Sequence, residues 1–151
     1  MRIIPFEEKY RDDMIFMILL AREALGVGPK IREDLLDVRA NYLDRGDMFW
    51  LALDENDRVA GSLGYRSMEG TDEVFLHRFF IRPDLKRRGI GSALLETAEA
   101  HLRAAGKTAM HVHLGWPREI WYESWTFYPK HGFAEYAPRY MKKALDRKDG
   151  L

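Results

Sequence analysis

The sequence of 151 residues contains no cysteine, and this absence removes several kinds of chemistry. Disulfide bonds, thiolate metal sites and a cysteine nucleophile all require a thiol, so all three are excluded. Long apolar runs are missing as well: the longest, Met14–Ala21, has eight residues, whereas roughly 20 are needed to span a bilayer. No signal-peptide pattern follows Met1. We therefore expect a cytoplasmic protein with no membrane partner.

Net charge is also missing, because 24 Lys and Arg residues balance 24 Asp and Glu residues. Domains that bind nucleic acid are usually basic overall, so we expect no nucleic-acid partner. Hydrophobic residues make up 46% of the chain and charged residues 32%, which is typical of a soluble globular protein. The length is that of one ordinary domain with one core, and we expect a single domain over residues 1–151.

Hydrophobic periodicity and turn residues divide the chain into alternating elements. The expected strands are residues 2–6, 49–53, 59–68, 74–81, 108–114, 133–136 and 140–145, and the expected helices are residues 7–25, 31–43, 89–105 and 120–130. The first helix is apolar nearly all round at 14–20, so we expect cover on more than one of its faces. One strand–helix–strand crossover, over 74–114, lies among antiparallel strands. This order predicts an α+β fold with a mixed sheet.

The clearest chemistry lies in the loop between the expected strand 74–81 and the helix that follows it. The loop residues are Lys86, Arg87, Arg88, Gly89, Ile90, Gly91 and Ser92. The first turn of a helix has unpaired N–H groups and a partial positive charge, and glycines let ligand oxygens approach them closely. With the added cations, this pattern predicts a cradle for a phosphate or pyrophosphate. The alternative is a tight turn beside a solvated basic loop.

This loop resembles the acyl-CoA loop of the GNAT superfamily of N-acyltransferases, whose pattern is Gln/Arg-x-x-Gly-x-Gly/Ala. Gly89 and Gly91 match, whereas Lys86 stands where the family has Gln or Arg. The resemblance implies acetyl-CoA as the acyl donor and a mostly antiparallel sheet, flanked by helices, with a splayed central strand pair. It also implies that the main chain of one strand end pairs with the pantetheine arm of CoA. That strand end is Phe79, Phe80 and Ile81.

A second block, residues 127–133, resembles the family's Tyr-x-x-x-Gly-Phe signature. The resemblance places Tyr128 near the CoA sulfur, as general acid or hydrogen-bond donor for the departing thiolate, and Ser124 beside pantetheine. The family often has Ala at the position of Ser124 and Asn at that of Trp121, so this sequence departs from it at both. The alternative for Tyr128 is a buried aromatic residue at the end of a helix.

An amine must lose a proton as it attacks a thioester, so a general base is expected. The first choice is His77, four residues before Ile81 on the same expected strand, and some amine acetyltransferases of the family carry a catalytic histidine at this position. The alternative is a strand histidine whose ring is satisfied by a neighbour. Other candidates are Glu73, Glu123, His111 and His113. His111 and His113 alternate on one face of a strand without an evident third ligand, so we expect no metal site.

Together these patterns favour an N-acetyltransferase that moves the acetyl group of acetyl-CoA to the primary amine of a small molecule or peptide by direct attack. The alternative is a domain of the same fold that binds CoA or another phosphate ligand without catalysis. The sequence is compatible with a homodimer.

Overall fold

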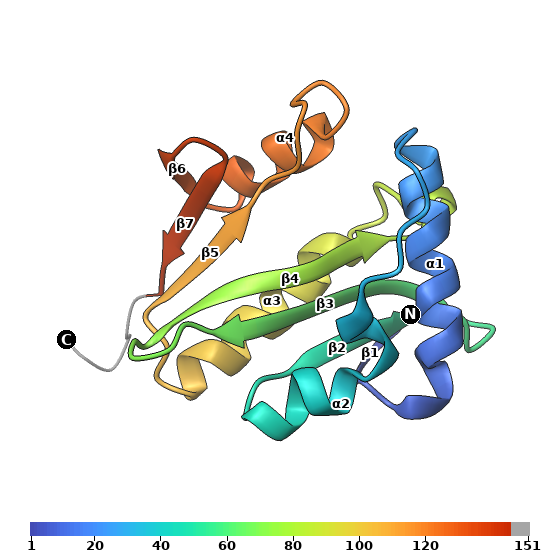
Figure 1. Cartoon of the computed structure of the whole chain (residues 1–151), viewed down its shortest axis with the longest axis horizontal. Coiled ribbons are helices and arrows are strands. Elements are labelled where there is room, and N and C mark those ends of the chain that lie inside the picture. Colours follow the sequence, from blue (N-terminus) through green and yellow to red (C-terminus); the bar gives the residue numbers. More distant parts are fainter. Residues whose placement is uncertain (146–151) are drawn as a thin grey trace. The chain divides into compact units, whose positions relative to one another are not determined.

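The computed structural model describes residues 1–145 (Figure 1). Its strands are β1 (Arg2–Pro5), β2 (Phe49–Leu53), β3 (Val59–Ser67), β4 (Glu73–Ile81), β5 (Ala109–His113), β6 (Ala134–Ala137) and β7 (Tyr140–Ala144). Its α-helices are α1 (Arg11–Ala24), α2 (Val38–Asn41), α3 (Ile90–Ala104) and α4 (Tyr122–Lys130). Short 3-10 turns are η1 (Glu8–Tyr10), η2 (Glu33–Leu36), η3 (Leu43–Arg45) and η4 (Pro83–Leu85). All seven expected strands are present within a residue or two.

The strands form one mixed sheet in the order β1-β2-β3-β4-β5-β7-β6. β4 and β5 run parallel, as a crossover through α3 requires, and pair through Glu73–Phe75 and Ala109–His111. The neighbouring pairs β1–β2, β2–β3, β5–β7 and β6–β7 are antiparallel. The α+β class is confirmed, and a pairing of three residues in a nine-residue strand agrees with the splayed pair that the resemblance implies.

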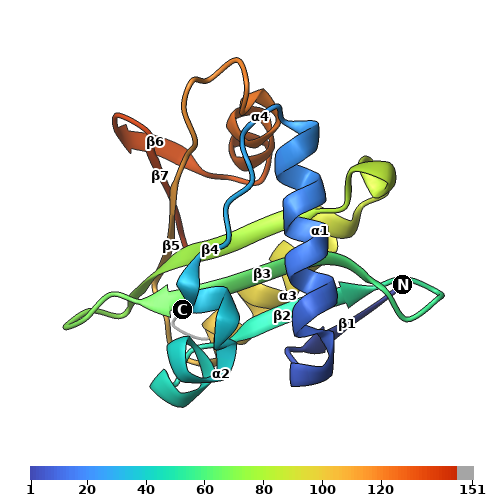
Figure 2. The ribbon, with the colours of Figure 1, turned by 45° about the vertical axis from the view of Figure 1, so that its right-hand side comes forward.

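The chain forms two compact units. The first contains Met1–Arg66 and His77–Ala98, and the second contains Ser67–Leu76 and the described chain from Glu99. In the first unit, α1 and the start of α3 lie on opposite faces of β2 and β3 (Figures 1 and 2). The core beneath α1 is almost entirely apolar and consists of Phe6, Tyr10, Met14, Met17, Ile18, Leu35, Val38, Tyr42, Phe49, Leu51, Leu53 and Val59.

One face of α1 is buried through Met14, Met17 and Ile18, whereas Phe16 is 53% exposed, so the helix is not covered all round. The expectation for the next segment is wrong. The single helix expected over 31–43 is broken into η2, α2 and η3. The break falls at Asp37, whose φ of −145° and ψ of 77° are not helical and whose side chain caps α2 by accepting from the N–H of Ala40. A capping aspartate therefore starts a new helix where periodicity predicted a continuous one.

In the second unit, β5 and β6 lie on either side of β7. The helix between β5 and β6, α4, is held to the preceding loop by Trp125, whose indole N–H donates to the carbonyl of Gly115 at 3.0 Å. Gly132, with φ +92°, lies just past the end of α4, where a glycine commonly terminates a helix. Among residues 1–145, no helix is long and apolar enough to cross a membrane.

Candidate active site

The loop predicted to bind pyrophosphate lies between β4 and α3 in the first unit. Its backbone is left-handed at Arg87 (φ +64°) and at Gly89 (φ +79°). Left-handed residues within a turn bring N–H groups to one side and create a concavity that suits anions. The conformation costs a non-glycine residue such as Arg87 about 1–3 kcal/mol, and residues strained in this way cluster at ligand sites. Such a backbone suits an anion, and binding of pyrophosphate by this loop stays a prediction.

The same loop opens directly into α3. The N–H of Ala93 donates to the carbonyl of Gly89 at 3.0 Å, so the N–H groups of residues 90–92 belong to the first, positively polarised turn of the helix. Arg87, Arg88 and Gly89 are exposed to solvent. The predicted loop residues therefore surround one helix N-terminus, with two exposed guanidinium groups beside it.

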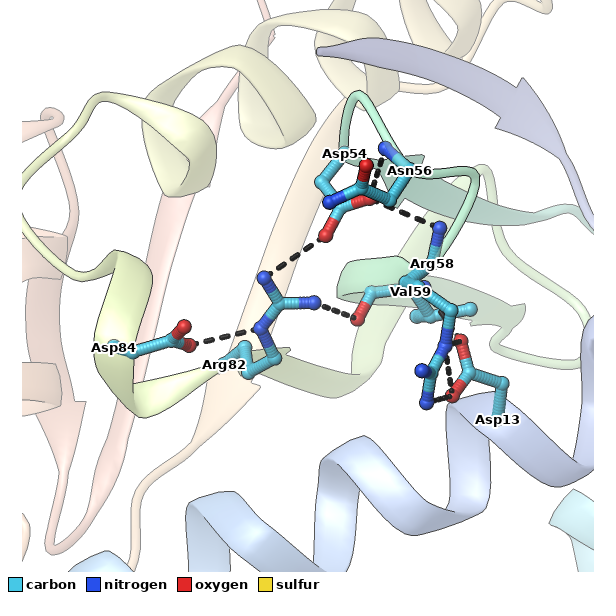
Figure 3. Close-up of polar contacts among 7 residues, drawn as sticks. All are labelled: Asp13, Asp54, Asn56, Arg58, Val59, Arg82 and Asp84. Carbon is cyan, nitrogen blue, oxygen red and sulfur yellow. Dashed lines mark hydrogen bonds and ion pairs between the residues drawn. The ribbon is translucent and has the colours of Figure 1, made fainter.

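Arg82, just before this loop, holds the end of β4 in place (Figure 3). Its Nη2 lies 2.9 Å from Oδ2 of Asp54, and its Nε donates to Oδ1 of Asp84 at 2.8 Å. Its Nη1 also donates to the carbonyl of Val59, and its main-chain N–H donates to the carbonyl of Ala60 at 2.8 Å. Two carboxylates contact this guanidinium and offset its charge. Arg82 therefore helps to hold the loop in place, and its side chain adds no net positive charge that would attract a phosphate.

The same network ties the turn between β2 and β3 to α1 (Figure 3). Asp13 accepts from the guanidinium of Arg58 at 2.6–3.1 Å and from the main-chain N–H of Val59 at 2.7 Å. The hydrogen bond from Arg58 holds the pKa of Asp13 below its usual value. Asp54 closes the turn by accepting from the main-chain N–H groups of Asn56 and Arg58. The strand end that leads into the loop is thus braced from a hairpin and from a helix.

The strand end predicted to pair with pantetheine has core side chains. Phe80 packs against the cluster beneath α1. Ile81 approaches Gly61 from the α3 side, where its Cδ1 and that of Leu94 lie 3.0 Å from the position a Cβ on Gly61 would take. Phe79 is partly buried. A ligand role for these three residues through their main chain stays a prediction.

His77 lies in a partly buried polar cluster of the first unit. Its Nδ1 is 3.2 Å from the hydroxyl of Tyr42, and that hydroxyl donates to Oδ2 of Asp34 at 2.6 Å. Burial, with the nearby guanidinium of Arg78, lowers the pKa of His77 to about 4. The ring is therefore neutral at physiological pH. A neighbour satisfies one ring nitrogen, as the structural interpretation of His77 expected, and the role of His77 as a base stays a prediction.

Arg78 makes β4 irregular directly after His77. It is a non-glycine residue with φ +55° inside a strand, a left-handed conformation that is uncommon for a residue with a side chain. The hydroxyl of Ser62 donates to its carbonyl at 2.7 Å, and its Nε and Nη2 donate to Asp34 at 3.0 and 2.9 Å. The sequence analysis did not identify Asp34, Tyr42 or Arg78 as site residues, because they meet only through tertiary contacts.

Tyr128 and Ser124 lie on α4 in the second unit. Tyr128 is 8% exposed and packs edge-on against Phe133 and Phe127, with ring centroids 5.1 and 5.5 Å away. Burial raises the pKa of Tyr128, so its hydroxyl keeps its proton. Ser124 is partly buried. The aromatic packing fits the core interpretation of Tyr128, while the retained proton is what a hydrogen-bond donor needs.

Two of the other candidate bases form one cluster in the second unit. The Nε2 of His111 lies 2.6 Å from Oε1 of Glu73, and its Nδ1 lies 2.8 Å from the hydroxyl of Tyr136. His111 is buried, whereas His113 is exposed and stacks on Tyr140 at 4.5 Å. Within residues 1–145, no three His, Asp or Glu side chains converge as a metal site would require.

Comparison with known proteins identifies the class. A sequence model of the Acetyltransferase (GNAT) family matches residues 15–133, and the chain belongs to this family. No curated protein matches it. Among solved structures, a GNAT-family acetyltransferase from Staphylococcus aureus Mu50 is similar, with TM-score 0.85, 21% identity, and cover of 96% of this chain and 99% of that one.

Two further similar structures contain a cofactor. The PaiA N-acetyltransferase from Thermoplasma acidophilum, in complex with coenzyme A, has TM-score 0.74 and 17% identity, with 95% of this chain and 99% of that one covered. A GNAT-family acetyltransferase from Brucella melitensis, in complex with acetyl-CoA, has TM-score 0.72 and 17% identity, with 96% and 88% covered. At such identities the likeness establishes the fold.

Proposed function

We propose that this protein is a cytoplasmic N-acetyltransferase that moves the acetyl group of acetyl-CoA to the primary amine of a small molecule or peptide. The observation that carries the proposal is the exposed, left-handed turn at Arg87 and Gly89 that opens into α3, in a chain of the GNAT family. The pyrophosphate of CoA is an anion that such a turn suits. Similar structures that hold coenzyme A or acetyl-CoA support this donor.

The reaction proceeds by direct attack. The lone pair of a neutral amine forms a bond with the thioester carbon while the carbonyl electron pair moves to oxygen. The attacking nitrogen then gives its proton to a base, and the oxyanion re-forms the carbonyl and expels the CoA thiolate. No covalent intermediate on the protein is required, which suits a chain without cysteine.

We assign the proton from the attacking nitrogen to His77. With a pKa of about 4, its imidazole is a weak base for a free alkylammonium, whose pKa is roughly 10 by analogy with lysine. The nitrogen becomes far more acidic once it is bonded to the thioester carbon. His77 therefore acts after the C–N bond begins to form, and the amine arrives in its neutral form.

We assign hydrogen bonding to the departing thiolate to Tyr128. A thiol titrates near about 8.5 and an unperturbed tyrosine near about 10, and burial raises the pKa of Tyr128 further. Full proton transfer from the phenol to the thiolate would run uphill, so Tyr128 donates a hydrogen bond and solvent completes the protonation. Ser124 and the main chain of Phe79, Phe80 and Ile81 are assigned to the pantetheine arm.

The test combines binding and turnover. Melting temperatures are measured with acetyl-CoA, CoA, ATP and NAD, and thiol release from acetyl-CoA is followed with a panel of amines and peptides. The protein adds no thiol background because it has no cysteine. Selective stabilisation by acetyl-CoA and CoA, with amine-dependent thiol release, is expected. Stabilisation without thiol release across the panel would favour a non-catalytic CoA-binding domain. No change in melting temperature at millimolar acetyl-CoA would refute both the acetyltransferase and the CoA-binding domain.

A further inference from the structure

A chain of hydrogen bonds runs from Asp34 through Tyr42 to His77 within the first unit. Asp34 comes from η2, Tyr42 directly follows α2, and His77 lies on β4. The O···O distance between Tyr42 and Asp34 is 2.6 Å, and the hydroxyl of Tyr42 is 3.2 Å from Nδ1 of His77. Tyr42 is fully buried, and its ring stands edge-on to the imidazole at 6.1 Å. Solvent therefore does not compete for the phenol at the centre of the chain.

Only one assignment of donors and acceptors satisfies the hydrogen bonds from Asp34 through Tyr42 to His77. Arg78 donates to both oxygens of Asp34. Burial alone would raise the pKa of Asp34, but the hydrogen bonds from Arg78 and Tyr42 outweigh it and hold the pKa below its usual value. The carboxylate is thus ionised and only accepts, so the single phenol proton of Tyr42 goes to Asp34. The Tyr42 oxygen then accepts from Nδ1–H of His77, and Nε2 carries the lone pair of the neutral ring.

We infer that Asp34 and Tyr42 are positioning residues that hold His77 in its Nδ1–H tautomer and so present Nε2 as the proton acceptor. The inference rests on the acetyl transfer proposed above. Without the Tyr42 hydroxyl, the imidazole is no longer held to one tautomer. The opposite tautomer carries its proton on Nε2 and cannot accept another there.

Burial keeps the His77 ring neutral, and the hydrogen bond to Tyr42 orients it. Two cations, Arg78 on β4 and Arg66 on β3, and two anions, Asp34 on η2 and Asp47 before β2, act on its pKa with opposing signs. Because these charges oppose one another, burial is the dominant cause of the low pKa of His77. The cluster therefore supplies an uncharged base, and Tyr42 decides which nitrogen is available.

The first test reads the tautomer directly. Long-range 1H–15N spectra of the whole protein distinguish the two tautomers for each of the five histidines, and His77→Gln identifies the resonance of His77. Wild type should show Nδ1–H at His77, and Tyr42→Phe should show a mixture of tautomers. Tyr10→Phe is the matched control, since Tyr10 is a buried tyrosine of the same unit whose hydroxyl also donates to a carboxylate, that of Asp57 at 2.8 Å. It should leave the spectrum of His77 unchanged.

The second test reads the reaction. Tyr42→Phe should lower kcat/KM for the amine about tenfold, the effect expected for one lost orienting hydrogen bond, while the acetyl-CoA thermal shift stays intact. In a His77→Gln background the same substitution should have no further effect. An Nε2–H tautomer in wild type, a loss no larger than that of Tyr10→Phe, or additive losses would each overturn the inference. An inactive wild type refutes the proposed function itself, whereas an active wild type with a failed Tyr42 comparison refutes only the positioning role.

Discussion

Replacing Gly89 by aspartate tests the pyrophosphate site with little steric disturbance. Gly89 has φ +79°, and no atom lies within 4 Å of the position that a Cβ would take. The substitution adds conformational strain of about 1–2 kcal/mol without a clash. The positive end of the helix dipole attracts the new carboxylate, which offsets about 0.3–1 kcal/mol of this strain. Since 1 kcal/mol moves the Tm of a protein of this size by about 2–4 °C, we expect Tm to fall by at most about 8 °C.

The response to acetyl-CoA should change far more. At a concentration of 100 times Kd, a ligand adds about 2.7 kcal/mol to stability, which raises the wild-type Tm by about 5–11 °C. In Gly89→Asp the new carboxylate lies where the pyrophosphate is predicted to bind and repels it, so the shift at the same concentration should fall below about 1 °C. Gly89→Ala carries the same strain without the charge and should keep most of the shift.

Gly106 provides the matched control at the other end of α3. It has the same φ of +79°, and no atom lies within 4 Å of its Cβ position. Asp at this C-terminal end opposes the helix dipole, so Gly106→Asp should lower Tm more than Gly89→Asp does yet keep the full acetyl-CoA shift. Differential scanning fluorimetry of the four proteins with and without acetyl-CoA decides. A folded Gly89→Asp protein with a full shift would refute the loop assignment, and an equal loss in Gly106→Asp would point to long-range repulsion instead.

Three further outcomes are expected. Arg87→Ala or Arg88→Ala should raise the acetyl-CoA KM severalfold and leave kcat nearly unchanged, because an exposed ion pair contributes up to about 1 kcal/mol of uniform binding; a fall in kcat alone in steady-state kinetics would contradict this. Tyr128→Phe should lower kcat about 10²-fold with binding intact, whereas an unchanged kcat, with strong destabilisation in Tyr128→Ala, would leave Tyr128 a core residue. The pKa of His77 is depressed to about 4, so the unfolded state takes up its proton first as pH falls from about 6.5. The contribution of neutral His77 to the free energy of unfolding should be fully present above that pH and should drop by at most about 3 kcal/mol toward pH 4. Urea unfolding of His77→Gln should lack this part of the loss, and identical acid profiles would refute the assigned pKa.

Local patterns in the sequence were enough to place the strands and to single out the glycine-containing loop before α3. The turn at 54–57 and the Gly89 loop each lie within a few residues, so their chemistry can be read directly. Where side chains meet over long separations, the sequence analysis was incomplete. It assigned no role to Arg82, and only the structure shows that Asp54 and Asp84 occupy its guanidinium.

The surroundings of the predicted base show the same limit. Tyr42 lies within the expected helix 31–43, and its side chain is fully buried in the structure. Its hydroxyl, however, joins residues that lie 8 and 35 positions away. Periodicity reports which side chains are buried, and it carries no information on which polar atoms they meet there. The hydrogen bonds that link Asp34, Tyr42 and His77 could therefore be found only from the structure.

Burial acts on the two predicted catalytic groups in opposite directions and with one result. It lowers the pKa of His77 and raises that of Tyr128, because a low-dielectric environment disfavours the charged form of each. Above about pH 5, His77 is a neutral acceptor and Tyr128 a neutral donor, and neither titrates in the physiological range. The rise of kcat/KM with pH should then follow the amine substrate, because its neutral fraction grows tenfold per pH unit below the pKa of that amine. A limb that stays fixed when amines of different pKa are compared would require a protein group that titrates near neutrality, and would exclude His77 as the base.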